Sequence, residues 1–125
     1  MKSAVDYEML RDAIIDDYGE ILARDIILYQ DAINLELLNG TVLEIKAASD
    51  REYCFLWQAG DHVLRLDTAP LHPELATFPH HLHDAAGTLR ADPLTVPGRP
   101  LADNVRPLLA ALQHDPLLGY GAAGA

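Results

Sequence analysis

Four of the six histidines in this 125-residue chain fall within one stretch of twelve residues. They are His72, His80, His81 and His83. Unperturbed imidazole exchanges protons near neutral pH, and it is the most common metal ligand in proteins. Prolines at positions 70, 73 and 79 restrict the backbone here, so we expect a defined loop over residues 68–83 that presents the histidines. If the chain carries out a reaction, the sequence places the groups for it in this loop.

An arginine and an aspartate precede the loop at alternating positions. A strand is predicted over residues 62–67, and alternation along it puts Arg65 and Asp67 on one face. Two imidazoles can act as general base and general acid, while a guanidinium binds phosphate. Such a set is sufficient for metal-free RNA cleavage, in which the 2′-hydroxyl attacks the neighbouring phosphate. The predicted catalytic residues are Asp67, His72, His80, His81 and His83, and Arg65 is predicted to bind substrate. A plain surface ion pair between Arg65 and Asp67 would explain their spacing equally well.

A metal site is an alternative use of the same histidines. If this end of the loop is extended, His81 and His83 face the same way, whereas in a helix His80 and His83 would. Either His72 or Asp67 could complete a site for zinc, nickel or copper. The spacing matches no structural zinc motif, however, so no metal and no other cofactor is predicted.

Composition limits the classes of protein to which the chain can belong. Its formal net charge is −10, and residues 1–50 hold eleven acidic residues against four basic ones. So few lysines and arginines argue against a broad, nonspecific grip on nucleic acid. Cys54 is the only cysteine, so no intramolecular disulfide can form, which fits a reducing, cytoplasmic compartment. No apolar run is long enough to cross a bilayer and no secretory signal is expected, so no membrane partner is predicted.

Helical spacing of apolar residues predicts two helices. One covers residues 3–18, with Ser3 as its cap and Gly19 as its stop. The other begins at an Asp103 cap and carries Pro107 in its first turn. Residues 84–100 have little periodicity, so we expect them to form a surface connection.

Five strands are predicted between the helices, over residues 20–30, 32–38, 41–47, 51–58 and 62–67. Asn39-Gly40 is a strong hairpin signal, and tight turns also join the later strands. The predicted fold class is therefore α+β, an antiparallel β-sheet of about five strands with an N-terminal and a C-terminal helix. We expect a single domain over residues 1–113 and a flexible C-terminal tail over residues 114–125.

Three segments around the histidine loop match a known family pattern. The first is Phe55-Leu56-Trp57-Gln58, the second runs from Leu64-Arg65-Leu66-Asp67 to Pro73-Glu74, and the third is Thr77-Phe78-Pro79-His80-His81-Leu82-His83. Together they resemble the TumE family of bacterial toxin–antitoxin proteins, closely over residues 53–83 and loosely over residues 3–113. The chain departs from the family at Thr68, Leu71 and Leu82, where the family has Asn, His and Lys. These departures remove one histidine and one cation from the pattern.

The resemblance implies a small toxin neutralised by a cognate antitoxin, a helix-turn-helix DNA-binding protein encoded beside it. The leading hypothesis is a cytoplasmic toxin, monomeric or homodimeric, that cleaves RNA through the loop histidines without a metal ion. Two alternatives stay open. One is a noncatalytic protein-binding module that docks a partner through the loop of prolines and histidines, and the other is a metal-dependent hydrolase.

Overall fold

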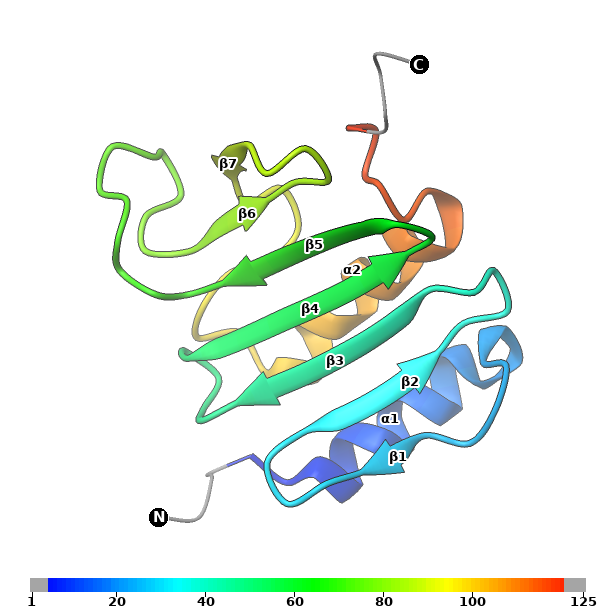
Figure 1. The fold of residues 1–125 in the computed structure, drawn as a ribbon. Helices are drawn as coiled ribbons and strands as arrows, with labels where there is room; N and C mark the ends of the chain where they lie inside the picture. The colour runs from blue at the N-terminus through cyan, green and yellow to red at the C-terminus, as the bar shows by residue number, and fades with distance from the viewer. Residues whose placement is uncertain (1–4, 121–125) are drawn as a thin grey trace.

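A computed structural model describes residues 5–120, which form one antiparallel sheet backed by two helices (Figure 1). The sheet has seven strands in the order β1-β2-β3-β4-β5-β6-β7, so each strand pairs with the next one along the chain. The strands are β1 (Ile27–Leu28), β2 (Ile33–Glu36), β3 (Val42–Ala47), β4 (Tyr53–Ala59), β5 (His62–Asp67), β6 (His81–His83) and β7 (Leu89–Ala91). The helices are α1 (Tyr7–Tyr18), followed by a short 3₁₀ turn η1 (Gly19–Ile21), and α2 (Leu101–His114). Both helices lie against one face of the sheet. The opposite face, toward the viewer in Figure 1, carries no helix from the described residues.

Alternation along the strands decides which side chains meet the helices. In β4, Tyr53, Phe55 and Trp57 are buried, while Cys54 and Leu56 between them are only half-buried. The buried side chains of the helix-covered face form the core together with the apolar stripe of α2, which comprises Val105, Leu108, Leu109 and Leu112. The aromatic residues of β4 are therefore core residues, and removal of their large apolar surface from water stabilises the fold.

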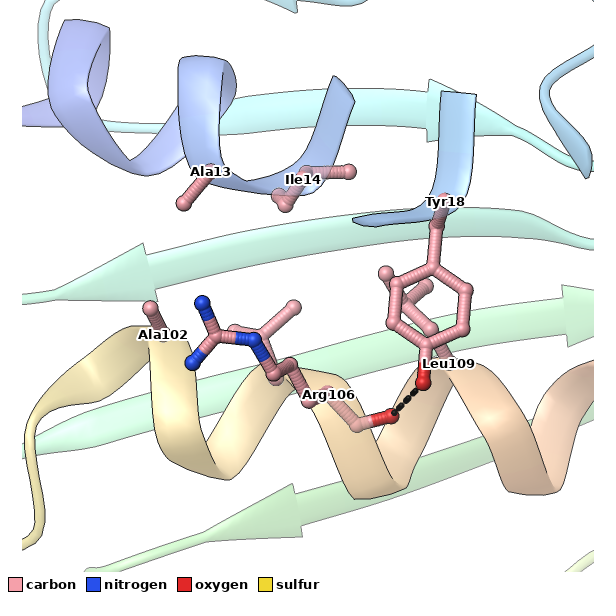
Figure 2. A pocket seen from close by; sticks show the side chains of 7 residues that line it. Ala13, Ile14, Tyr18, Ala102, Arg106 and Leu109 are labelled. Atoms are coloured by element: carbon pink, nitrogen blue, oxygen red, sulfur yellow. Dashed lines mark hydrogen bonds between the residues drawn. The ribbon is translucent and has the colours of Figure 1, made fainter. Parts of the chain in front are cut away.

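Helix α1 begins after Asp6, whose carboxylate accepts the N–H of Met9 at 3.1 Å and so satisfies one of the free donors of the first turn. Its buried face packs on the sheet and beside α2. Figure 2 shows the seam between the two helices, where the Tyr18 hydroxyl donates to the Arg106 carbonyl oxygen at 3.1 Å. Leu109 of α2 and Ile14 of α1 line the same seam. The two helices thus form one layer over the sheet.

The fold class is confirmed as α+β with an antiparallel sheet and a helix at each end, but the sheet has seven strands instead of five. The two additional strands, β6 and β7, lie within segments predicted to be loop and surface connection. Each has three residues, so alternation over so short a run gave no strand signal. Strand β6 forms because it pairs with β5. Its central residue, Leu82, is the partner of Leu66 in this pair, and both side chains are buried in the core.

The expected long strand over residues 20–30 is wrong. This segment contains η1, an isolated bridge between Leu22 and Leu37, and the two-residue strand β1. Residues 23–25 between them are exposed, and apart from a hydrogen bond from the Ala23 N–H to the Glu36 carbonyl oxygen of β2 they form no strand. The Asn39-Gly40 hairpin is confirmed, because β2 and β3 pair across it and Gly40 has a φ of 89°, a conformation that glycine adopts without strain.

The helix boundaries also differ from the prediction. Ser3 lies outside the described residues, and Asp6 caps α1. Helix α2 begins at Leu101, ahead of the expected Asp103 cap, because the Leu101 N–H donates to the Asp50 carboxylate at 3.0 Å. Asp50, from a turn distant in sequence, thus provides the hydrogen-bond acceptor for the first N–H group of α2. Pro107 is consequently inside the helix and not in its first turn.

The segment after α2 was predicted to be a tail. Within it, the Trp57 indole N–H donates to the Pro116 carbonyl oxygen at 2.8 Å, and Leu117, Leu118 and Tyr120 pack against the core. Residues 121–125 of the predicted tail lie outside the described residues. Neither helix within residues 5–120 is long and apolar enough to cross a membrane.

Candidate functional site

Four polar side chains converge where β5 pairs with β6. Arg65 stands opposite His83 and Asp67 stands opposite His81, while Leu66 between them faces the core. Because side chains alternate along a strand, the four polar residues share the face of the sheet that no described helix covers. The prediction that Arg65 and Asp67 share a face is confirmed, and so is the extended alternative for the histidines, since His81 and His83 lie in a strand.

Hydrogen bonds and an ion pair link these four residues into one chain of contacts. Asp67 lies at its centre, with Arg65 Nε 2.8 Å from one carboxylate oxygen and His81 Nε2 3.0 Å from the other. Arg65 also contacts His83 Nε2 at 3.0 Å through a terminal nitrogen. Since guanidinium nitrogens can only donate, His83 Nε2 must accept, and the proton of the neutral ring lies on Nδ1. The lone pair of the His83 ring therefore points at the Arg65 guanidinium.

A fifth residue, His72, reaches these side chains from the loop between β5 and β6. Its ring centroid lies 4.9 Å from that of His81 and 6.2 Å from that of His83, and the His81 and His83 rings are 4.9 Å apart. One ring nitrogen from each histidine lies within 4.8 Å of the others. We call the set of Arg65, Asp67, His72, His81 and His83 the outer-face cluster.

The members of the outer-face cluster differ in their access to solvent. The side chain of His81 is only 1 % exposed, whereas those of His72 and Arg65 are 30 % and 46 % exposed. Nδ1 of the enclosed His81 ring lies 3.2 Å from the Pro79 carbonyl oxygen. Burial lowers the pKa of His83, and the positive charge of nearby Arg65 lowers it further, so the His83 ring is neutral at neutral pH. A ligand approaching from solvent thus meets His72, His83 and Arg65.

A cleft of about 560 Å³ opens beside the cluster, and two guanidinium-bearing residues, Arg51 and Arg65, contribute to its wall. Asp67 and Cys54 line it as well. Burial, followed by the negative charge of Asp67, raises the pKa of the Cys54 thiol, which keeps it protonated and disfavours a nucleophilic role. The cleft therefore offers two guanidinium groups to a phosphate, beside the carboxylates of Glu52 and Asp67 and a neutral thiol.

His80 does not join the outer-face cluster. Its Nδ1 lies 2.8 Å from the buried carboxylate of Asp92, which also accepts the Thr95 hydroxyl. Thr95 Oγ1 is 2.7 Å from the Tyr53 hydroxyl, and burial raises the pKa of Tyr53 to about 12. We call these four residues, His80, Asp92, Thr95 and Tyr53, the inner network, since Tyr53 belongs to the helix-covered face of the sheet.

The structure thus brings together five of the six residues predicted for the site and separates His80 from them. Sequence reasoning missed Asp92, the partner of His80, and Arg51 in the cleft. The sequence does contain a signal for Asp92. Asp92 is followed three residues later by Thr95, and an aspartate in such a position favours a turn. The Asp92 carboxylate accepts the N–H groups of Leu94 and Thr95 in such a turn.

Comparison with known proteins gives one match. A family model described as toxin TumE matches residues 10–113, a range that contains the outer-face cluster, the inner network and most of α2. No curated protein and no solved structure matches the chain.

Proposed function

The chain belongs to the toxin TumE family, and we propose that it is the toxin of a bacterial toxin–antitoxin pair and cleaves RNA without using a metal ion. The observation that carries the proposal is the outer-face cluster, in which two solvent-accessible imidazoles and a guanidinium lie together beside a cleft that a second arginine, Arg51, also lines. General acid, general base and charge stabilisation are the three functions that transesterification of a phosphodiester needs.

In this proposal His83 is the general base. Its Nε2 lone pair, held by Arg65 at 3.0 Å, takes the proton of the ribose 2′-hydroxyl once Arg65 turns toward the phosphate. The 2′-oxygen then forms a bond to phosphorus as the bond from phosphorus to the 5′-oxygen breaks. Protonated His72 gives its proton to the departing 5′-oxygen, which leaves a cyclic phosphate and a free 5′-hydroxyl. Arg65 stabilises the charge that develops on the phosphate oxygens.

Asp67 and His81 serve as positioning residues. Asp67 binds Arg65 and His81 and also accepts the Ala69 N–H at 3.0 Å, so it fixes the exit of β5. His81 is too enclosed to touch a substrate, yet its ring lies against His72 and His83 and sets their separation. His80 takes no part in the proposed chemistry, because its ring is bound to Asp92 in the inner network.

The experiment that tests this function uses the purified full-length chain and a mixed-sequence RNA in the presence of a metal chelator. We expect cleavage products that end in a cyclic phosphate, and loss of cleavage in His83→Ala and in His72→Ala. His114→Ala is the matched control, because His114 is exposed at the end of α2, away from the cluster. Intact RNA after incubation with the unaltered chain, or equal cleavage by all variants, would contradict the proposal.

The proposed partner is a cognate antitoxin with a helix-turn-helix DNA-binding domain. Co-expression of the adjacent gene product should yield a complex and restore growth to cells that produce the toxin. We further propose a cytoplasmic location, in which the single cysteine stays reduced. The mass of the free chain in solution decides between a monomer and a homodimer.

A second candidate function is noncatalytic docking of a protein through the loop between β5 and β6. It is favoured by two large apolar side chains exposed on this loop, Leu71 at 69 % and Phe78 at 43 %. Replacing both with serine should then abolish partner binding while leaving the fold intact. Undiminished binding by the double variant would rule out docking at this loop.

A further inference from the structure

We propose that His72, His81 and His83 form a binding site for one divalent transition-metal ion, and that zinc is the ion they fit best. Metal binding itself does not depend on the proposed function. One consequence does rest on it: an ion bound to these imidazoles occupies the lone pairs that acid–base cleavage of RNA needs, so zinc would inhibit the toxin.

The first support is the geometry of the three rings. One nitrogen from each ring lies within 4.8 Å of the others, although the histidines come from a loop and from two positions on β6. Zinc–imidazole bonds of about 2.0–2.1 Å in a tetrahedral site place nitrogens roughly 3.4 Å apart. Each ring would therefore move inward by less than about 1 Å, which side-chain rotation alone can supply.

The second support is the kind of donor and its surroundings. Imidazole nitrogens suit zinc, nickel and copper, whereas magnesium and calcium prefer oxygen ligands. Three histidines leave a fourth tetrahedral position open, as in sites where zinc holds a water or an anion. Asp67, 3.0 Å from His81 Nε2, is the carboxylate neighbour that commonly orients metal-bound histidine, so the ion would bind His81 Nδ1 in place of its 3.2 Å contact with the Pro79 carbonyl oxygen. His81 is enclosed and the other two rings are half-buried, so the site is partly shielded from water.

Arg65 is the group that competes with the metal. It donates to the lone pair of His83 Nε2 at 3.0 Å, and its positive charge repels an incoming cation. Because 46 % of its side chain is exposed and it lines the cleft, Arg65 can turn away from His83 without unfolding the site. We therefore expect Arg65→Gln to bind zinc more tightly than the unaltered chain does.

The test is calorimetric titration of zinc chloride into the full-length chain, purified without a histidine tag. We expect one zinc ion per chain, and affinity weakened on the order of 100-fold or more in His72→Ala and in His83→Ala, since each loses a direct ligand. His62→Ala and His114→Ala are matched controls that also remove one histidine each, from outside the cluster, and should bind zinc unchanged. Tetrahedral cobalt absorption in the unaltered chain, lost in the two cluster variants, provides a second measurement.

Three results would overturn the proposal: no zinc binding by the unaltered chain, equally tight binding by the two cluster variants, or weaker binding by Arg65→Gln. If a cluster variant fails to fold, imidazole signals in nuclear magnetic resonance spectra of the unaltered chain decide instead. Zinc must then shift the signals of His72, His81 and His83 and leave those of His62 and His114 in place. A shift confined to the last two would rule the site out. Because no RNA is present, a negative result here leaves the proposed cleavage activity untouched.

Discussion

Two consecutive histidines where β6 begins, His80 and His81, each bind an aspartate, but in different surroundings. His80 contacts Asp92 at 2.8 Å inside the inner network, and His81 contacts Asp67 at 3.0 Å in the outer-face cluster. The side chain of Asp92 is fully buried, and its carboxylate is bound by His80, by the Leu94 N–H and by the Thr95 hydroxyl. Asp67 instead adjoins a cleft and residues that solvent reaches. The same pair of residue types therefore supports the fold in one region and is available to a ligand in the other.

The largest expected effect separates the two regions by activity. In His83→Ala, the rate of RNA cleavage should fall by about 10²- to 10⁴-fold, since a general base is lost. The free energy of unfolding should change by no more than about 1 kcal/mol, because the ring is half-buried and bonded only to a solvent-exposed arginine. Single-turnover cleavage and urea denaturation of the same preparation measure both quantities. A large loss of stability would mean that His83 supports the fold, as the residues of the inner network do.

The complementary change is Asp92→Ala in the inner network. Removal of the Asp92 carboxylate leaves His80 and Thr95 without their buried partner, so the free energy of unfolding should drop by about 3–5 kcal/mol. Cleavage per folded molecule should stay the same. Urea denaturation followed by Trp57 fluorescence gives the stability, since this indole lies in the core. If stability holds while cleavage is lost, the division between the two regions is wrong.

A smaller effect is expected from Arg65→Lys, which keeps the charge and removes the planar fork. Lysine cannot hold Asp67 and His83 together as Arg65 does, so cleavage should fall by roughly 10- to 100-fold. Stability should be almost unaltered, as expected for an exposed ion pair. Steady-state cleavage rates at several RNA concentrations separate weaker binding from slower chemistry. Full activity would show that only the charge of Arg65 matters.

The smallest effect concerns Asp84, whose carboxylate accepts the N–H groups of Ala86 and Thr88 in the β6–β7 turn. Burial acts to raise the pKa of Asp84, but hydrogen bonds from Arg90 and from the N–H groups of Thr88 and Ala86 outweigh it and lower the pKa below its ordinary value. A lowered folded-state pKa stabilises the fold above the unfolded-state value, and this contribution is lost as the pH falls through the folded-state pKa.

Asp84→Asn should therefore reduce the free energy of unfolding by about 1.5 kcal/mol at neutral pH, where charged hydrogen bonds are lost. The difference between the two chains should shrink as the pH falls below about 4. Urea denaturation at a series of pH values measures it. A difference that is independent of pH would mean that the Asp84 charge does not stabilise the turn.

Patterns local in sequence predicted much of the fold. Burial alternates residue by residue in β3, β4 and β5, since a strand that packs one face on a core must repeat every two residues. Alternation also placed Arg65 and Asp67 together. The short strands failed for the same reason, because three residues such as His81–His83 contain too little of the repeat. The structure also explains Leu82, which stands where the family pattern has a lysine. The Leu82 side chain is buried in the core, so a lysine at this position would point away from the outer-face cluster.

Residues close in sequence therefore determined the strand faces, the Asn39-Gly40 hairpin and the concentration of histidines before Asp84. Tertiary structure alone decided that Asp50 would start α2, that Asp92 would bind His80, and that His72 would lie against His81. The physical reason is that a partner's identity depends on which distant segments the sheet and its loops bring within hydrogen-bond distance. Local periodicity fixes the direction of a side chain, and the packing of the whole chain fixes what it meets there.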